Sequence, residues 1–494
     1  RWNYVLDGLV EMGDLDATQR AQMQFPQTRD PAEYSAYTEA PGAYGHIKNQ
    51  VIAELERVGI TEDQVATGGL KITTTIDMNV QNSSTEAVDG QLQSLQEDAR
   101  AAAVTIDPAS GAVRGYFGGH ESTGWDYANA GLQTGSTFKI FALAAALQQG
   151  IGLDTYYSSA PYQLPGSQVV TNDGGGCGNC SIAEALKNSF NTSFLRLQAD
   201  LENGTQDTAD MAHALGIAKS LPGIEKTLTE NGGAPFEGVV LGQYQSRPLD
   251  MASAMATLTN GGVWHQPHFV QKVETTGGEV LYEFNDNGGE RRVSANVANN
   301  VLKAMLPIAG WSNGALAGGR ASASKTGTTQ LGNTGTNKDA WMVGSTPQLA
   351  TAVWVGTADN TSAIFNSYGG IMYGSDAPTR IWKQILDTSL VNSEYQSFPT
   401  AYPIRYGSGN WGSGYTGSYG SSTEYGNGYG NNDDAPEETA NPESPAPGDQ
   451  PAPSPHQPAT SPEAPAQPGA PAPDVPSLED IINGQGDLAE LLRP

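Results

Sequence analysis

A serine and a lysine three residues apart, Ser136 and Lys139 in "GSTFKIFALAAAL", could act as a nucleophile and its base. The apolar run that follows predicts a buried helix, with Ser136 in its first turn and Lys139 on the same face. Burial disfavours the charged form of a lysine, so it would lower the pKa of Lys139 and make the amine a proton acceptor. The alternative is an ordinary helix start whose lysine reaches solvent.

Both the serine–lysine spacing and a second polar spacing recur in the chain, so neither identifies a site alone. Ser-x-x-Lys also occurs at Ser322 and Lys325. Ser-x-Asn occurs at three places, Ser189/Asn191, Ser294/Asn296 and Ser408/Asn410. An assignment therefore depends on further motifs.

Ser312 in "GWSNG" is another candidate nucleophile, because Gly-x-Ser-x-Gly is the pattern of the nucleophile elbow in α/β-hydrolases. That elbow follows a strand and needs a histidine later in the chain. The preceding "ANNVLKAMLPIAG" has a helical pattern, and the only downstream histidine is His456. The sequence therefore disfavours Ser312.

The segment "SKTGTT" supplies a third motif, at the start of a predicted strand. Lys325 offers a positive charge, and Thr326 and Thr328 offer hydroxyls, for a carboxylate ligand. Gly327 would let a ligand approach the backbone. In chain order, "STFK", "SFN" and "KTG" form the motif set of penicillin-binding proteins and class A β-lactamases.

With these motifs in place, the chain resembles the transpeptidase part of a class A (bifunctional) penicillin-binding protein. The resemblance covers about residues 69 to 390, through "GGLKITTTID", "IDPASGAVRGYFGG", "ALKNSFNTSF" and "DAWMVGSTPQLATAVWVG". "RWNYVLDGLVEMG" resembles the end of the glycosyltransferase domain, whose catalytic part is absent from this sequence. Glycosyltransferase activity is therefore not expected of this chain.

The resemblance implies catalytic roles for three side chains. Ser136 would attack the carbonyl between the two terminal D-alanines of a peptidoglycan stem peptide and form an acyl-enzyme. Lys139, kept neutral partly by the charge of Lys325, would take the proton of Ser136. Ser189 would relay a proton between Lys139 and the leaving amine.

The resemblance also implies a substrate-binding set. Asn191 would hydrogen-bond the donor peptide backbone, and Lys325, Thr326 and Thr328 would hold the terminal carboxylate. The backbone N–H groups of Ser136 and Thr328 would form the oxyanion hole. Neither a metal nor a cofactor is implied.

The function implied is a peptidoglycan D,D-transpeptidase that β-lactams acylate and inhibit. A D,D-carboxypeptidase or a β-lactamase would share the three motifs and use water as the acceptor. The Glu-x-x-Leu-Asn motif that activates water in class A β-lactamases is not visible after Ser189. A non-catalytic β-lactam receptor and a structural envelope protein are the alternatives of another class.

The expected fold class is α+β, the penicillin-binding transpeptidase (serine β-lactamase-like) fold, with an antiparallel sheet packed between helices. A hairpin around "DPASG" and a late three-strand meander would share the sheet. The expected parts are the end of the glycosyltransferase domain (1–28), a linker (29–98), the transpeptidase domain (99–395) and a disordered Gly/Tyr/Ser-rich, then Pro-rich acidic tail (396–494).

The net charge and the first residues of the chain indicate which partners and which location to expect. A formal net charge of -28 over 494 residues argues against nucleic acid. The chain begins at Arg1 and has no apolar run that could span a bilayer, so we expect a piece of a longer protein. The resemblance implies the outer face of the bacterial cytoplasmic membrane, with an anchor upstream. Expected partners are stem peptides that supply a D-Ala-D-Ala donor and an amine acceptor, β-lactams, and cell-wall synthesis or division proteins.

The two cysteines of the chain, Cys177 and Cys180, lie in the glycine-rich run "NDGGGCGNCS". Two thiols alone make a poor zinc site, and a redox role would need a strand-to-helix turn of a βαβ unit. A local disulfide or two free thiols is expected.

Overall fold

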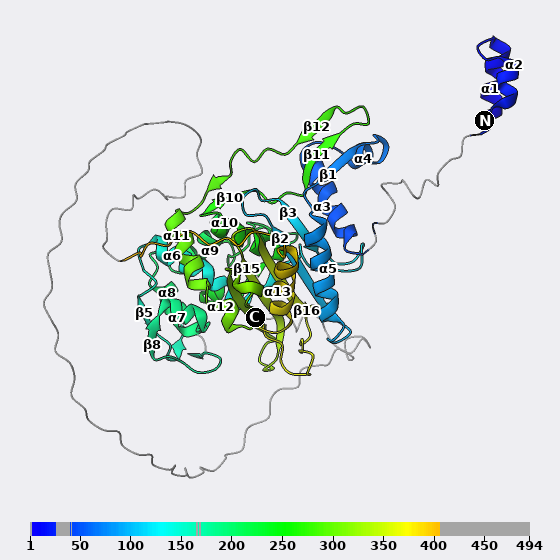
Figure 1. The fold of residues 1–494 in the computed structure, drawn as a ribbon. Helices are drawn as coiled ribbons and strands as arrows, with labels where there is room; N and C mark the ends of the chain where they lie inside the picture. The colour runs from blue at the N-terminus through cyan, green and yellow to red at the C-terminus, as the bar shows by residue number, and fades with distance from the viewer. Residues whose placement is uncertain (1, 26–39, 41, 165, 167–168, 406–494) are drawn as a thin grey trace, which may run out of the picture. The chain divides into compact units, whose positions relative to one another are not determined.

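The computed structural model describes residues 2–25, 40, 42–164, 166 and 169–405 (Figure 1). The predicted tail from residue 406 onward lies outside the described residues. The first described part comprises α1 (Trp2–Met12) and α2 (Ala17–Gln22). Asp16 is the N-cap of α2, because its side chain accepts from the Thr18 and Gln19 amides. A local side-chain contact thus fixes where this helix begins.

A five-stranded antiparallel sheet forms the centre of the main part, with the strand order β14-β15-β16-β2-β3. The predicted hairpin and the predicted late meander share this sheet, as expected. Asp107 closes the hairpin turn, because its carboxylate accepts the Ala109 amide at 2.9 Å. The strands are β2 (Ala99–Ile106), β3 (Val113–Phe117), β14 (Ala323–Gln330), β15 (Asn337–Ser345) and β16 (Ala350–Thr357).

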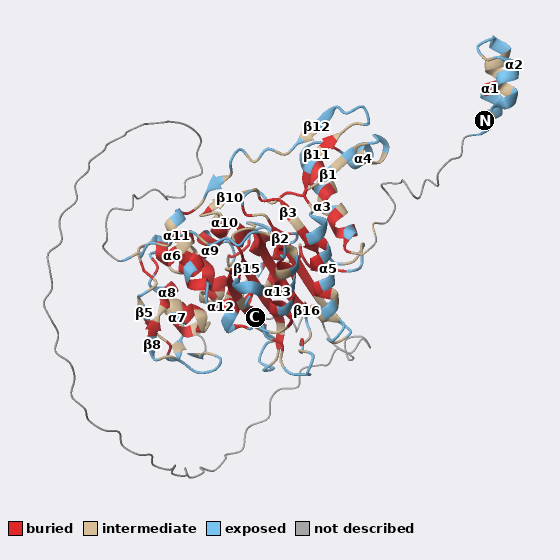
Figure 2. Cartoon of the chain, in the orientation of Figure 1, coloured by how far each residue is buried: buried red, intermediate tan, exposed pale blue. Residues whose placement is uncertain are grey.

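Helices cover both faces of this sheet, so its strands are almost wholly buried (Figures 1 and 2). Alternate residues along each strand belong to two separate apolar clusters. One face packs on α5 (Met78–Leu92) and α13 (Ala377–Ser389), and the other on α6 (Lys139–Gln148), α10 (Pro248–Thr259) and α11 (Ala295–Met305).

The predicted linker is not a separate element along its whole length. Val80, Ala87 and Val88 of α5 are buried on the sheet face that α13 also covers. The boundary at residue 99 cuts α5 away from that face, because a short helical pattern does not reveal what it packs on. The rest of the linker contains α3 (Tyr44–Arg57), α4 (Glu62–Thr67) and β1 (Lys71–Thr74). β1 pairs with β11 (Val270–Glu274), which pairs in turn with β12 (Val280–Glu283).

Smaller elements complete the main part. The shorter helices are α7 (Ile182–Lys187), α8 (Asn191–Ala199), α9 (Thr205–Leu215) and α12 (Ile308–Trp311), with 3-10 turns at Gly135–Phe138, Glu237–Leu241 and Ala317–Gly319. Short strand pairs are β4 (Leu132–Gln133) with β9 (Gln245–Ser246), β5 (Tyr156–Ser158) with β8 (Asn179–Ser181), β6 (Tyr162–Gln163) with β7 (Val169–Val170), and β10 (Val263–Trp264) with β13 (Glu290–Arg291). None of the helices in the described ranges is long and apolar enough to cross a bilayer.

Residues 396–405 also differ from the expectation, because they lie along α11 instead of belonging to the tail. Asn300 donates to the Tyr402 carbonyl at 2.8 Å, and the Tyr402 amide donates to Asn296 at 2.9 Å. Phe398 and Ile404 pack on the larger apolar cluster. The change in composition that marks the tail therefore begins after this segment.

Candidate active site

Ser136 lies in a 3-10 turn, Gly135–Phe138, that leads directly into α6. The serine therefore precedes the first turn of the α-helix instead of lying in it. The turn packs on β14 at very short range. A Cβ atom on Gly135 would lie 2.6 Å from the Thr328 amide nitrogen, and Gly135 has a φ of 57°. Only glycine therefore fits before the serine, and the serine backbone lies beside that of Thr328.

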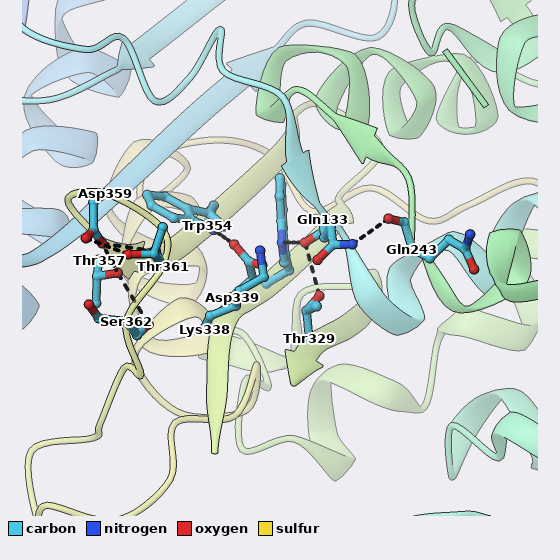
Figure 3. A network of polar contacts seen from close by, with 11 residues as sticks. Gln133, Gln243, Thr329, Lys338, Asp339, Trp354, Thr357, Asp359, Thr361 and Ser362 are labelled. Atoms are coloured by element: carbon cyan, nitrogen blue, oxygen red, sulfur yellow. Dashed lines mark hydrogen bonds and ion pairs between the residues drawn. The ribbon is translucent and has the colours of Figure 1, made fainter. Parts of the chain in front are cut away.

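Gln133, just before this turn, is held from three sides (Figure 3). Its carbonyl accepts from Trp341 Nε1 at 2.8 Å and from Thr329 Oγ1 at 3.2 Å, while its side chain donates to the Gln243 carbonyl at 2.6 Å. The donors lie on β14 and β15, so the sheet itself positions the chain that carries the serine.

Lys139 is fully buried at the start of α6, and its Nζ atom is surrounded by oxygens. Ser136 Oγ lies 2.7 Å away, Asn191 Oδ1 2.7 Å, the Ser189 carbonyl 2.8 Å and Ser189 Oγ 3.3 Å. The alternative in which this lysine reaches solvent is wrong. The amine instead bridges two of the predicted motifs.

Ser189 lies between α7 and α8 with a φ of 60°, a left-handed backbone conformation that is uncommon for serine. This geometry turns its hydroxyl toward both lysines, since Lys325 Nζ donates to Ser189 Oγ at 2.9 Å. Lys325 also donates to the Thr326 carbonyl at 3.0 Å. Ser136, Lys139, Ser189 and Lys325 thus form one continuous polar chain.

Burial without a counter-charge dominates the electrostatics of this cluster. Burial, followed by the nearby charge of Lys325, holds the pKa of Lys139 well below its usual range. Burial alone lowers the pKa of Lys325 to about 7. The neutral form of Lys139 is therefore accessible near neutral pH, and its lone pair can accept the proton of Ser136.

Strand β14 divides its residues between two faces. Lys325 and Gly327 are buried, while Thr326 and Thr328 are half-buried on the alternate positions. A Cβ on Gly327 would overlap the Thr134 carbonyl and lie 2.8 Å from Thr137 Cγ2. The missing side chain thus makes room for the turn that carries Ser136.

The remaining sequence candidates have no such setting. Ser312 follows α12, which follows α11, so no strand precedes it as an elbow requires. Ser322 lies just before β14, and Lys325 contacts Ser189 and Thr326, so the second Ser-x-x-Lys match is a coincidence of spacing. Cys177 and Cys180 form a disulfide, which confirms the first of the two expectations for these residues.

Motif reasoning missed the two segments that border the site. The Asn191 side chain donates to the Thr171 carbonyl at 3.5 Å, and the Gly374 amide donates to Thr328 Oγ1 at 3.3 Å. In the sequence, the run "NDGGGCGNCS" indicates only a possible disulfide. Tertiary packing, which no short pattern encodes, brings both segments to the site.

The chain matches the family described as penicillin binding protein transpeptidase domain over residues 101–387. It belongs to this family. The penicillin-binding protein 1A of Mycolicibacterium smegmatis is 52% identical over 404 residues, and that of Mycobacterium tuberculosis 51% over 405 residues. These alignments cover 81% of this chain but only 52% and 49% of the relatives, so the chain spans about half their length.

Solved structures agree with the family match. The penicillin-binding protein PonA1 from Mycobacterium tuberculosis is 51% identical with a TM-score of 0.71, covering 73% of this chain and 94% of that chain. A second structure of PonA1, in complex with penicillin V, has the same identity and score and covers 74% of this chain and 97% of that chain. The predicted family, fold and transpeptidase class are confirmed.

Proposed function

We propose that this chain cross-links peptidoglycan stem peptides as a serine D,D-transpeptidase and that β-lactams inhibit it by acylating Ser136. The observation that carries the proposal is the 2.7 Å contact between Ser136 Oγ and the buried Lys139 amine. A nucleophile needs a base within hydrogen-bond reach and with a suitable pKa, and Lys139 meets both conditions.

In the first half-reaction, Lys139 takes the Ser136 proton while Oγ bonds to the carbonyl carbon of the penultimate D-alanine. The tetrahedral oxyanion lies between the Ser136 and Thr328 amides, whose close approach the Gly135 packing supports. The C–N bond then breaks, and the proton passes from Lys139 through Ser189 to the departing D-alanine amine. The product is an ester on Ser136.

In the second half-reaction, an amine from another stem peptide attacks this ester. Its proton returns through the same groups to Ser136 Oγ, and an amide replaces the ester. Water would give a carboxypeptidase or β-lactamase instead. With penicillin the leaving nitrogen stays tethered to the acyl group, so it continues to block the site.

Donor binding follows from the edge position of β14. Among the described strands, β14 pairs with β15 and stands at the end of the sheet, so an extended peptide can add to its other edge. The half-buried hydroxyls of Thr326 and Thr328 are placed to hold the terminal carboxylate, with Lys325 supplying charge. Asn191 Oδ1 accepts from Lys139 and one N–H of its Nδ2 donates to the Thr171 carbonyl, which leaves the second N–H to meet the peptide backbone.

The setting of the whole protein is part of this proposal. Residues 1–28 would end a glycosyltransferase domain, and the transpeptidase domain would run to residue 405 and include α5. The Cys177–Cys180 disulfide supports an extracytoplasmic site, since oxidising conditions preserve such bonds. We therefore place the chain at the outer face of the cytoplasmic membrane, with other cell-wall synthesis proteins as partners.

A donor competition assay tests the choice of acceptor. The protein is incubated with a D-Ala-D-Ala stem pentapeptide and increasing concentrations of an amine acceptor peptide, and both products are counted by mass spectrometry. We expect the cross-linked dimer to grow at the expense of the hydrolysed tetrapeptide. A product that stays entirely hydrolysed at saturating acceptor would establish a carboxypeptidase instead.

A further inference from the structure

A segment outside the three motifs lies directly against the turn that carries the proposed nucleophile. It consists of the 3-10 turn Glu237–Leu241 and the two residues that follow, Gly242 and Gln243. A Cβ atom on Gly242 would overlap the amide nitrogen and the carbonyl oxygen of Gly135 and would lie 2.6 Å from Thr134 Oγ1. The two backbones are therefore in direct contact, and a side chain at position 242 would displace one of them.

A hydrogen bond connects the same segment to the residue before the turn. Gln133 donates from its side chain to the Gln243 carbonyl at 2.6 Å (Figure 3). Gly242, which precedes this carbonyl, has a φ of 72°, and its amide donates to the Val239 carbonyl at 3.0 Å. Position 242 therefore favours glycine for its left-handed backbone as well as for the lack of space.

Contacts on both sides of this position fix the segment in place. Val239 is fully buried, and Gln198 of α8 donates to the Glu237 carbonyl at 2.9 Å. At the other end, Ser246 of β9 pairs with Leu132 of β4. Because the segment is held at both ends in a packed interior, an added side chain between them would displace the neighbouring turn instead.

The same turn also lies against β14. A Cβ on Gly135 would lie 2.6 Å from the Thr328 amide nitrogen, so the Gly135 backbone contacts both Thr328 and Gly242. In the proposed mechanism the amides of Ser136 and Thr328 bind the oxyanion. The separation of these two amides depends on how closely the turn lies on β14, and the contact with Gly242 therefore affects it.

We propose that Gly242 is a positioning residue for the acylation of Ser136. Without a side chain at this position, the segment holds the turn against β14 and thereby fixes the distance between the Ser136 and Thr328 amides. The inference rests on the proposed function, because that function assigns the oxyanion to these two amides. A small shift of the turn would weaken hydrogen bonds that form fully only in the transition state, and it would leave ligand binding to β14 largely intact.

The test compares Gly242→Ala with Gly150→Ala as a matched control. Gly150 follows α6 with a φ of 85°, and a Cβ there would meet nothing within 4 Å, so alanine adds comparable backbone strain without a contact. Gln133→Met is the second variant, because it removes the donor to the Gln243 carbonyl. Stopped-flow measurements with benzylpenicillin give the maximal acylation rate constant and the dissociation constant of the non-covalent complex separately.

For Gly242→Ala we expect the maximal rate constant to fall about 10- to 100-fold, with the dissociation constant changed less than about twofold. Gln133→Met should lower the same rate constant about 3- to 10-fold, the range of one hydrogen bond. Gly150→Ala should stay within about twofold of the parent. The pH profile of acylation should keep its shape in all three variants, because Lys139 is not displaced.

An unchanged rate constant in both Gly242→Ala and Gln133→Met would overturn the positioning role. An equal loss in Gly150→Ala, or an effect confined to the dissociation constant, would overturn it too. If Gly242→Ala does not fold, Gln133→Met decides by the same criteria. A changed pH profile would assign the loss to Lys139 and not to the oxyanion hole, which also contradicts the proposal. Failure of benzylpenicillin to acylate the parent would overturn the proposed function instead.

Discussion

Two polar networks in this domain differ in how they offset the free-energy cost of burying a cation. Arg247, at the start of α10, donates to Asp250 through Nε at 2.9 Å and through Nη2 at 2.6 Å. Beside it, Tyr116 donates to Asp126 at 2.7 Å. In the site cluster, by contrast, the two lysines donate to hydroxyl, amide and carbonyl oxygens of the described residues.

The difference teaches what makes a buried cation reactive. Burial disfavours the charge of Arg247, but the Asp250 carboxylate outweighs it and the pKa of Arg247 is raised. No carboxylate of the described residues contacts Lys139, and burial followed by the charge of Lys325 lowers its pKa. The chain has 53 acidic and 25 basic residues, so carboxylates are abundant. The fold nevertheless surrounds these two lysines with neutral oxygens, and this lowers their pKa values.

Among these substitutions, Lys139→Met should have the largest effect on the acylation rate. We expect the acylation rate constant for benzylpenicillin to fall about 10²- to 10⁴-fold, the contribution of a positioned base. The free energy of unfolding should fall by about 1–3 kcal/mol, because the Ser189 carbonyl and Asn191 Oδ1 lose their donor. Stopped-flow acylation and calorimetry measure the two quantities. A rate within tenfold of the parent would remove Lys139 from the mechanism.

Arg247→Met should have the reverse pattern. Leaving Asp250 buried without its partner is expected to cost about 3–5 kcal/mol of unfolding free energy, measured by denaturant titration. Folded protein should still acylate at close to the parent rate. The control is Arg247→Met with Asp250→Leu, which should recover much of the stability because no carboxylate remains unpaired. A stable single variant would contradict the pairing.

Sequence reasoning could predict the site's residue types and that a hairpin and a late meander share one sheet, because three short motifs and the strand patterns indicate them. It could not order the strands, so the β16–β2 pairing that joins the two parts came only from the structure. The local pattern alone could not choose between the two roles of Lys139, since burial depends on packing by distant elements; the role of base followed only from the resemblance. Nor could it place Gly327 against the Ser136 turn or Ser189 in a left-handed conformation. The contact of Lys139 with Asn191 spans 52 residues and that of Lys325 with Ser189 spans 136, and no local pattern records such distances.

The pH profile of acylation sharpens the comparison within the site. With a pKa of about 7, Lys325 is charged below that pH and neutral above it. If its charge holds the ligand carboxylate, the second-order rate constant should fall as the pH rises through about 7. Lys325→Arg stays charged and should lose this descending limb, while the rise at lower pH that reflects Lys139 remains. An unchanged limb in the arginine variant would assign it to another group.

Tyr116→Phe is expected to have the smallest effect of these substitutions. It removes the hydroxyl that donates to Asp126 but keeps the ring and its edge contact with Phe269. We expect a loss of about 0.5–1.5 kcal/mol in unfolding free energy and an unchanged acylation rate. A large kinetic effect without loss of stability would show that this network reaches the active site.

The most direct test of the central claim is mass spectrometry of the intact protein and its peptides after incubation with benzylpenicillin. The account predicts one stable adduct, on the peptide that contains Ser136, and none in Ser136→Ala. An adduct on Ser312, or no adduct on the parent chain, would contradict it.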